Sequence, residues 1–508
     1  MDPHSDKSDG LDTQAVQQCI QILESILEDR VRLAGIPPAL RHALIMAAGR
    51  VSRPDKLEIM KLSKVYRRQK KKTNDAADRR AVADTAIRTA RRQEVFQNPT
   101  ALPPVRTERP RLNRPRNCYV CKKEFDTLHF FYDSMCATCG DFNFQKRSQT
   151  ASLDGTVTLL TGGRIKIGYQ CALMLLRAGS HVIVTTRFPR DAVQRFSREK
   201  DYADWNKRLE LHGLDLRHSP SVDAFCEHLI QHLPRLDFLI NNAAQTVRRP
   251  PGFYRHLLEQ ESVPLSTLPT HLRTPLAAYE GFRTPRLHTG IESDWVADLA
   301  TQGAAIGLQA AGLLTQIPVL KEDSEPDKAF FPEGKRDADL QQVDLRTMNS
   351  WRMKLADVPT PELIEVQLVN AIAPFILCSK LKRVMLRHPY RYKHVVNVSA
   401  MEGKFTRYTK TDRHPHTNMA KAALNMMTLT SAPDYAKDGI CMNAVDTGWV
   451  TDEDPAQHSE RKQLEHDFQP PLDIVDGAAR VCDPIFSHLL TGEGTWGKFL
   501  KDFTPTSW

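Results

Sequence analysis

The chain has 508 residues, of which 41% are hydrophobic and 26% are charged, a balance typical of globular proteins with more than one domain. Mean hydropathy is -0.44, and no apolar stretch approaches the ~18–20 residues that span a bilayer, so we expect no transmembrane segment. The N-terminus lacks the basic start and the apolar core of a secretory signal. These features predict a cytoplasmic protein whose ten cysteines are thiols or metal ligands rather than disulfides.

The net charge of +9 comes from one segment. Residues 61–116 hold 17 basic and 5 acidic side chains, whereas the rest of the chain is close to neutral. A basic segment of this kind can bind nucleic acid, an acidic partner or an anionic membrane. It can equally be a solvated helix face followed by a linker, and the sequence leaves both interpretations open.

The first part of the chain, residues 1–96, is predicted to be helical and to become basic toward its end. Apolar residues recur every three or four positions over 16–31, a second helix fits 39–49, and a third follows Pro54 and runs into the basic stretch. Residues 97–116 are rich in Pro and Arg. This composition predicts an extended linker and a domain boundary.

Four cysteines follow in two pairs with CxxC spacing. They are Cys118, Cys121, Cys136 and Cys139, with fourteen residues between the pairs. This pattern predicts a tetrahedral Zn²⁺ site in a small module over 117–147 that resembles a zinc ribbon. The site would be structural, because four thiolates leave no position for a substrate. A redox or disulfide role remains the alternative.

Alternating strand and helix signals occupy the rest of the chain, from about residue 155 to 508. Short apolar strands are predicted over 157–160, 181–186, 209–214 and 236–240, with helical segments between them. This alternation predicts an α/β fold with a Rossmann-like, doubly wound parallel sheet. A glycine-rich turn follows the first strand, where a pyrophosphate can approach backbone N–H groups at a helix N-terminus.

Several ordered motifs resemble those of the short-chain dehydrogenase/reductase family. They are TGGRIKIG at 161–168, NNAA at 241–244, Asn370, Lys421, and DTGWVT at 446–451. The resemblance implies a nicotinamide cofactor and the interconversion of a carbonyl and an alcohol. It also implies which positions hold that cofactor: Thr161, Gly162, Gly163, Arg164, Lys166, Ile167, Gly168, Asp215, Leu216, Asn242, Ala243, Ala244, Lys421, Gly448, Val450 and Thr451.

The choice between NADP and NAD follows from charge. An acidic residue at the end of the second strand would favour NAD by binding the ribose 2′-hydroxyl. This chain has no acid there and ends the strand on Arg187, while Arg164 and Lys166 lie in the glycine turn. These cations predict NADP, with NAD less favoured. The alternative is that Arg187 packs on the adenine and Lys166, which replaces the family's middle glycine, is solvated.

The catalytic positions depart from the family. Thr417 occupies the position of the family's proton-donating Tyr, and the alignment through the preceding strand places Ala400 at the family's Ser, with Ser399 beside it. A Thr hydroxyl is a poor general acid, so an active enzyme needs another group to supply the proton. A histidine near 414–416 is one candidate. The alternative is that the two histidines there only cap or pack the helix. The candidate catalytic residues are Asn370, Lys421, Ser399, His416, Tyr408 and Thr417.

A long insertion, about 245–361, separates the NNAA motif from the helix that carries Asn370, and part of it is expected to form a lid over the nicotinamide end. Three hypotheses remain. The first is an NADP-dependent oxidoreductase with an unusual proton donor and an unknown small-molecule substrate. The second is a catalytically silent NADP-binding sensor or scaffold, and the third is a zinc protein associated with nucleic acid. The sequence leaves a homo-oligomer open.

Overall fold

The computed structural model describes residues 11–96, 109–288, 306–308, 310–324, 329–406 and 410–508. The chain divides into two compact units, Met1–Ala76 and Ala77–Trp508. The first is helical, and the second contains the sheet.

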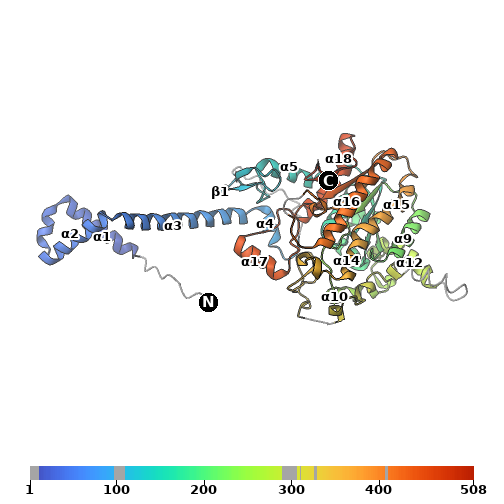
Figure 1. Cartoon of the computed structure of the whole chain (residues 1–508), viewed down its shortest axis with the longest axis horizontal. Helices are drawn as coiled ribbons and strands as arrows, with labels where there is room; N and C mark the ends of the chain where they lie inside the picture. Colours follow the sequence, from blue (N-terminus) through green and yellow to red (C-terminus); the bar gives the residue numbers. More distant parts are fainter. Residues whose placement is uncertain (1–10, 97–108, 289–305, 309, 325–328, 407–409) are drawn as a thin grey trace. The chain divides into compact units, whose positions relative to one another are not determined.

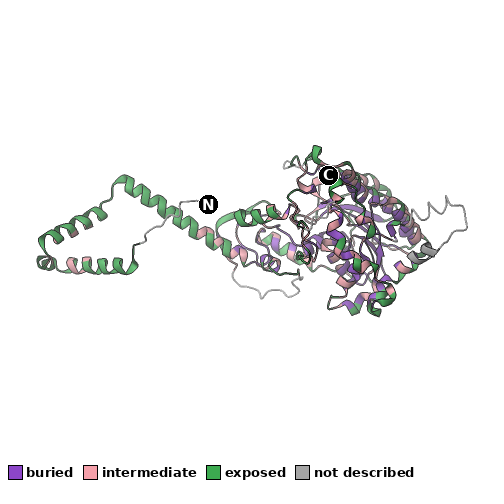
Figure 2. Ribbon diagram, turned by 90° about the horizontal axis from the view of Figure 1, so that it is seen from below, coloured by how far each residue is buried: buried purple, intermediate pink, exposed green. Residues whose placement is uncertain are grey.

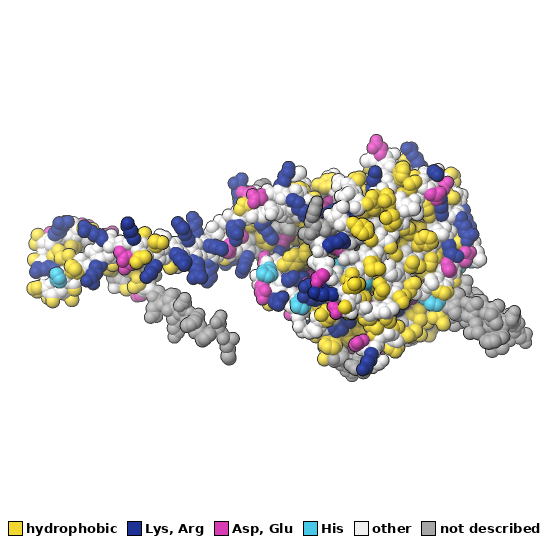
Figure 3. All heavy atoms as spheres, in the orientation of Figure 1, with side chains coloured by type: hydrophobic (Ala, Val, Ile, Leu, Met, Phe, Trp, Pro, Cys, Tyr) yellow, Lys and Arg dark blue, Asp and Glu magenta, His cyan; other side chains and the backbone are white. Residues whose placement is uncertain are grey.

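The first unit consists of α1 (Thr13–Glu28), a short 3₁₀ turn (Arg30–Gly35), α2 (Pro38–Ser52) and most of α3 (Lys56–Ala83). The three helices predicted from the sequence are present. None of residues 11–76 is buried, and all of these helices appear green or pink in Figure 2. Lys and Arg side chains follow α3 over much of its length (Figure 3). The basic surface predicted from the sequence therefore lies mainly on one exposed helix.

The helical segment 1–96 is not one domain, which corrects the prediction. Residues from Ala77 onward belong to the second unit, where α4 (Ala86–Arg91) follows α3. Ile87 is buried in a cluster with Leu472 and Val475. Arg91 donates hydrogen bonds to the carbonyls of Pro470 and Leu472. The last part of the segment that was predicted as one helical domain therefore packs into the core.

The predicted linker 97–116 is also corrected at its C-terminal end. Residues 97–108 lie outside the described part, but β1 (Arg111–Asn117) is a strand that pairs antiparallel with β2 (Glu124–Thr127). The carboxylate of Asp78 accepts hydrogen bonds from the backbone N–H groups of Asn113 and Arg114. The end of this Arg-rich segment is thus held by β2 and by the end of α3.

The second unit is built around an eight-stranded sheet with the order β10-β9-β8-β7-β6-β3-β4-β5. Every neighbouring pair is parallel except β9 and β10. The strands are β3 (Val157–Thr161), β4 (His181–Thr186), β5 (Leu209–Gly213), β6 (Phe238–Asn241), β7 (Lys393–Ser399), β8 (Ile440–Asp446), β9 (Phe499–Lys501) and β10 (Thr504–Thr506). The strand order reverses between β3 and β6, where ligands bind in such sheets.

Helices cover both faces of this sheet, as predicted. On one face α6 (Lys166–Arg177) packs with α18 (Ile474–Thr491) over a core of aliphatic and aromatic side chains. On the other face α9 (Ser219–His232), α15 (Ala373–Met385) and α16 (Pro415–Lys437) lie side by side (Figure 1). The α/β doubly wound fold is confirmed.

One helical run of the described residues, Thr360–Met385, is long and apolar enough to cross a membrane by length and composition. It comprises α14 (Thr360–Gln367), a π-helical turn (Leu368–Ile372) and α15. This run differs from the expectation that no apolar stretch approaches the length of a membrane span. Over half of its apolar window, 56%, is buried inside the protein, as in a core helix.

Further helices lie in the connections between the strands. The connections after β4 and β8 carry α7 (Pro189–Phe196), α8 (Tyr202–Trp205) and α17 (Ala456–His466). The insertion 245–361 contributes α10 (Pro251–Ser262), α11 (Thr270–Arg273), α12 (Ala277–His288) and several 3₁₀ turns. Its described part is therefore largely folded.

Candidate active site

A cavity of about 1250 Å³ runs along the carboxyl ends of the parallel strands. It is lined by the glycine turn, the ends of β4 and β5, the segment after β6, the start of α16 and the loop after β8. The predicted cofactor residues line it, except Thr161 and Gly163, which lie behind its wall. Of the candidate catalytic residues, Asn370, Ser399, Thr417 and Lys421 line it as well.

The glycine turn is a close-packed cradle that larger residues would fill. Gly162 has φ +71°, and a Cβ on it would lie 2.9 Å from the Cα of Ala243. A Cβ on Gly168 would lie 2.2 Å from the carbonyl oxygen of Gly162. One on Gly163 would lie 2.6 Å from Val184 on β4. The turn therefore needs glycine at all three positions, which fits a backbone that must approach a pyrophosphate.

The segment after β6 braces this turn. The hydroxyl of Thr161 accepts hydrogen bonds from the backbone N–H groups of Asn242 (3.1 Å) and Ala243 (3.0 Å). The side-chain amide of Asn242 in turn donates to the carbonyls of Thr161 and Gly162. The NNAA segment thus holds the turn in place.

Lys166 takes a conformation usually reserved for glycine. Its φ is +52°, so this residue, which stands at the family's middle glycine, has a left-handed backbone that few non-glycine residues adopt. Its Nζ lies 3.7 Å from Oε1 of Glu453, beyond the loop after β8. The charge of Glu453 raises the pKa of Lys166. Lys166 is therefore paired with Glu453 and is not placed among the cations of the adenosine end.

At that adenosine end the two predicted arginines differ. Arg164 forms an ion pair with Asp191 (2.6 Å) and is buried, which corrects its expected role as a free cation. Arg187 donates to the hydroxyl of Tyr254 (2.7 Å), and its guanidinium lies 4.5 Å from the centre of that ring. No ion pair is found for Arg187 within the described part of the chain. It is therefore the cation of this end best able to meet a further anion.

Asp215 lies at this end of the cavity as predicted, but its carboxylate is engaged. Arg217 contacts both of its oxygens, with Nη2 at 2.6 Å from Oδ2. Burial would raise the pKa of Asp215, but the charge of Arg217 holds it below the usual value. Leu216, between them, also lines the cavity. Asp215 thus meets the cavity as half of an ion pair.

At the opposite end, Asn370 and Lys421, which the resemblance implies as catalytic residues, both line the cavity. Asn370 lies on the π-helical turn, and its side chain exchanges two hydrogen bonds with the backbone of Gln245. Lys421, on α16, donates to the carbonyl of Val398 (2.7 Å). Burial lowers the pKa of Lys421 to about 8, although the charge of Glu402 opposes this shift. The ammonium can therefore lose its proton near the physiological range.

The other candidates for proton transfer are less well placed. Ser399 ends β7, and its hydroxyl donates to the side chain of Asn425 (2.6 Å) on α16. Nε2 of His416 lies 3.3 Å from Glu362 on α14, and His416 does not line the cavity. The prediction of His416 as a proton donor is therefore wrong, because its ring turns toward α14. Tyr408 lies outside the described residues.

His414 was considered from the sequence only as a residue that caps or packs the helix, not as a proton donor. It precedes α16 with φ +40° and lines the cavity. Its ring stacks on Trp351 of the insertion, with centroids 4.0 Å apart and planes at 7°. Its Nδ1 lies 3.0 Å from the hydroxyl of Thr417, the residue predicted to stand at the family's Tyr position. A titratable side chain is thus in hydrogen-bond contact with Thr417.

The insertion forms a wall along the whole cavity. Phe253 and Tyr254 line the adenosine end near Arg187, whereas Asn349 and Trp351 line the end near His414. The insertion therefore lines both ends of the cavity, and a lid over the nicotinamide end stays a prediction.

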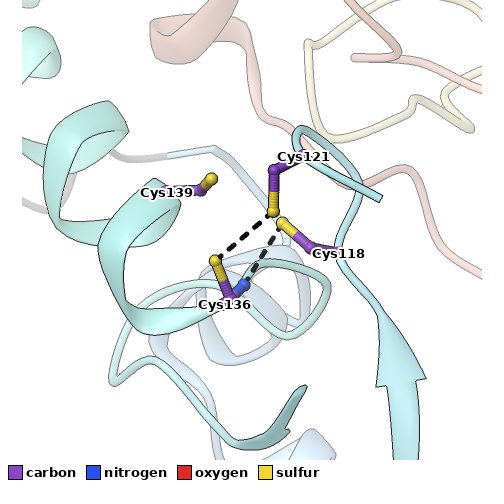
Figure 4. A group of neighbouring side chains, drawn as sticks. All are labelled: Cys118, Cys121, Cys136 and Cys139. Atoms are coloured by element: carbon purple, nitrogen blue, oxygen red, sulfur yellow. Dashed lines mark hydrogen bonds between the residues drawn. The ribbon is translucent and has the colours of Figure 1, made fainter. Parts of the chain in front are cut away.

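The four cysteines come together as predicted (Figure 4). Cys118 and Cys121 lie on the turn after β1, whereas Cys136 caps α5 (Ala137–Arg147) and Cys139 lies in its first turn. All four Sγ atoms lie within 4.8 Å of one another. The second cysteine pair, Cys136 and Cys139, therefore lies at the start of a helix. A zinc ribbon would place it on a second hairpin.

The geometry of this four-cysteine cluster fits a tetrahedral metal ion. The Sγ atoms of Cys121 and Cys136 are 3.8 Å apart, and bonds of ~2.3 Å to Zn²⁺ place neighbouring sulfurs about 3.8 Å apart in a tetrahedron. The backbone N–H of Cys136 points to Sγ of Cys118 (3.4 Å), as Figure 4 shows.

Two family models match this chain. The model described as short chain dehydrogenase matches residues 156–260, and the one described as Enoyl-(Acyl carrier protein) reductase matches residues 347–471. Both ranges lie in the sheet unit and contain most of the cavity's motifs. The chain belongs to the short-chain dehydrogenase/reductase superfamily. The interval between the two matches falls within the insertion.

The relatives match this chain over very different lengths. An uncharacterized protein, R665, of Acanthamoeba polyphaga mimivirus is 30% identical over 398 residues, covering 76% of this chain and 74% of the viral one. Because residues 155–508 are only about 70% of the chain, that match extends into the segment before them. Rat peroxisomal 2,4-dienoyl-CoA reductase (Rattus norvegicus) is 28% identical over 170 residues, covering 33% of this chain and 56% of its own. Mouse retinol dehydrogenase 14 (Mus musculus) is 36% identical over 100 residues, covering 18% and 30%.

Among solved structures, the Pseudomonas aeruginosa RhlG/NADP complex is 16% identical, with a TM-score of 0.41, over 69% of this chain and 95% of its own. A Burkholderia cenocepacia short chain dehydrogenase in complex with NADP is also 16% identical, with a TM-score of 0.40, over 68% and 96%.

Proposed function

We propose that this protein is an NADP(H)-dependent oxidoreductase that interconverts a carbonyl and an alcohol. The observation that carries the proposal is the glycine cradle, braced by Asn242, which opens into the same cavity as Lys421 and Asn370. When bound, the nicotinamide would supply or accept a hydride. The glycine turn would hold the pyrophosphate, Lys421 the nicotinamide ribose, and the loop 446–451, with Gly448, Val450 and Thr451, the carboxamide.

The preference for NADP rests on Arg187. This guanidinium lies on the cavity wall at the end of β4, where the adenosine ribose sits in folds of this type. Its described partner is the neutral hydroxyl of Tyr254, so its charge is available to a 2′-phosphate. Arg164 and Lys166 contribute less than the sequence suggested, because Asp191 and Glu453 pair with them.

The proton would pass through His414 and Thr417. The hydroxyl of Thr417 can donate to the carbonyl of His414 (2.9 Å) while it accepts from Nδ1–H of the protonated ring (3.0 Å). A substrate oxygen in the cavity would take the place of that carbonyl as acceptor. The Thr417 hydroxyl alone is a weak acid, but the imidazolium behind it can replace the proton that it gives.

Reduction of the carbonyl requires one hydride and one proton, and each has a source in this scheme. The carbonyl oxygen of the substrate would take the proton of Thr417, while a bound, reduced nicotinamide would supply the hydride for the carbonyl carbon. The hydroxyl of Thr417 recovers a proton from Nδ1 of His414, and His414 is later reprotonated from solvent. Oxidation of the alcohol runs through the same groups in reverse.

Two measurements test this function together. Calorimetric titration of the full chain with NADPH and NADH should show one site that prefers NADPH. NADPH oxidation against a panel of aldehydes, ketones and enones should then show turnover with at least one class. Absence of NADPH binding would contradict the proposal outright.

A catalytically silent NADP-binding protein is the second candidate. It is favoured by Thr417 and Ala400 at the family's Tyr and Ser positions, and by Ser399, whose hydroxyl is committed to Asn425. This candidate expects tight NADPH binding with no turnover across the panel. It further expects turnover to appear in a Thr417→Tyr variant.

For the four-cysteine cluster we propose one structural Zn²⁺ per chain, held by Cys118, Cys121, Cys136 and Cys139. Metal analysis of the purified protein should find about one zinc, and Cys136→Ser should lose it and melt at a lower temperature. Cys226→Ser, at a buried cysteine on α9, is the matched control that should retain the metal. Equal zinc in all three proteins, or none in the wild type, would contradict the assignment.

A further inference from the structure

The four-cysteine module, residues 117–147, forms part of the cavity wall. Tyr119, between the first two cysteines of the module, lines the cavity together with Gly448 and Trp449 of the loop after β8. Its hydroxyl accepts a hydrogen bond from the backbone N–H of Trp449 (3.0 Å). It also lies 3.2 Å from where a Cβ on Gly448 would stand. One side chain thus connects the cysteine turn to the loop 446–451.

Other contacts fix Tyr119 from the opposite side. Its backbone N–H donates to the carbonyl of Ser134 (2.8 Å), just before the second cysteine pair. The ammonium of Lys501 lies 5.5 Å from its ring centre, and Lys501 also approaches Asp446 at the end of β8 (3.6 Å). The position of the Tyr119 ring therefore depends on the fold of the module and on the sheet.

A second path joins the module to the glycine turn. The hydroxyl of Tyr132 donates to Asp476 (2.5 Å), and Arg147 forms ion pairs with Asp473 and Asp476 at the start of α18. The next residue, Gly477, packs so closely on Ile167 that a Cβ would lie 2.9 Å from it. The helix that the module holds thus backs the cofactor cradle.

We propose that Tyr119 is a positioning residue through which metal binding in the four-cysteine module controls cofactor affinity. With the ion bound, the turn 118–121 is fixed, and Tyr119 holds the backbone of Gly448 and Trp449 where the carboxamide would be bound. Loss of the ion frees this turn and, with it, the loop. The inference rests on the proposed function for its ligand, but the contact from Tyr119 to the loop is independent of that function.

Tyr119→Phe in the full chain tests this coupling, because it removes only the hydroxyl. Hydrogen exchange at the Trp449 amide, followed by mass spectrometry of a peptide over 446–452, should become at least several-fold faster. Zinc content should stay the same, and the NADPH dissociation constant should rise about three- to tenfold. Tyr435→Phe is the matched control, since its hydroxyl donates to the carbonyl of Cys378 far from this loop.

Removal of zinc from the wild type by a chelator should reproduce the faster loop exchange and the weaker binding, and readdition of Zn²⁺ should reverse both. Unchanged exchange in Tyr119→Phe would overturn the inference. So would faster exchange with unchanged NADPH affinity, because the loop would then not limit binding. If the wild type binds no NADPH at all, the proposed function fails, and the exchange measurement alone still decides whether the module holds the loop.

Discussion

The two ends of the cavity are constrained in different ways. At the glycine turn, most residues follow the family's motif, with Lys166 in place of its middle glycine, and Asn242 braces the turn. At the end near α16, the hydroxyl of Thr417, the predicted counterpart of the family's Tyr, contacts His414, whose ring stacks on Trp351. Gly162, Gly163 and Gly168 leave no room for a Cβ, whereas a proton can come from any titratable group within reach. The first end is therefore constrained by shape and the second by chemistry.

The insertion contributes a different aromatic side chain to each end of the cavity. At the adenosine end it places Tyr254 in hydrogen-bond contact with Arg187, the cation that was predicted there. At the other end it adds Trp351, which fixes the ring of a histidine that is outside the helix. The same segment thus supports an expected contact at one end and a new one at the other.

The largest expected effect comes from filling the cradle. Gly168→Ala places a Cβ 2.2 Å from the Gly162 carbonyl, so the turn must open, and NADPH affinity should fall roughly 100-fold. Gly281→Ala on α12 is the matched control, because a Cβ there meets nothing within 4 Å. Titration of both variants, with melting temperatures recorded, checks this. Wild-type affinity in Gly168→Ala would show that the turn does not hold the cofactor.

A smaller and more selective effect is expected at Arg187. Arg187→Ala removes a charge-assisted contact to a 2′-phosphate, so NADPH should bind about 10- to 30-fold more weakly while NADH binding changes little. Calorimetry with both cofactors measures the difference. An equal loss of affinity for NADPH and NADH would mean that Arg187 stacks on the adenine and does not bind the 2′-phosphate.

A few-fold effect of pH should arise at Lys421. Burial lowers its pKa to about 8 in the free protein, and an anionic ligand nearby would raise that pKa on binding. The NADPH dissociation constant should therefore be flat below pH 8 and increase above it, because binding must then recover a proton. Lys421→Met should bind more weakly at every pH but without this rise. An identical rise in the variant would assign it to another group.

No effect is expected from deleting residues 1–76. None of the described residues of that unit is buried, and the residues that line the cavity all belong to the second unit. NADPH affinity and melting of 77–508 should match those of the full chain. Extending the deletion to residue 96 should destabilise the protein, since Ile87 and Arg88 are buried and Arg88 pairs with Asp133.

The sheet and the cradle could be predicted because their residues carry local signals. Parallel strands buried on both faces appear as apolar runs, and the predicted strands 157–160 and 236–240 differ from β3 and β6 by only a few residues. Glycines and the paired cysteines are equally visible by spacing. Each of these features depends on short-range geometry.

The rest depended on contacts between distant segments. His414 has a left-handed backbone before the helix, so helical spacing could not show that its ring meets Thr417, and His416 was the natural but incorrect choice. The strand β1 is polar and mostly exposed, which made it resemble a linker. Its pairing with β2 and its contact with Asp78 are set by the tertiary fold.

The contrast between the two ends is tested most directly by measuring NADPH affinity and turnover in the same variants. His414→Gln should keep the NADPH dissociation constant within about twofold of wild type and lose roughly 100-fold or more in turnover. Thr417→Val should do the same, and His416→Gln, at the neighbouring histidine that faces α14, should retain turnover if it folds. Full turnover in His414→Gln, or turnover lost only together with NADPH binding, would contradict a proton path separate from the cofactor cradle.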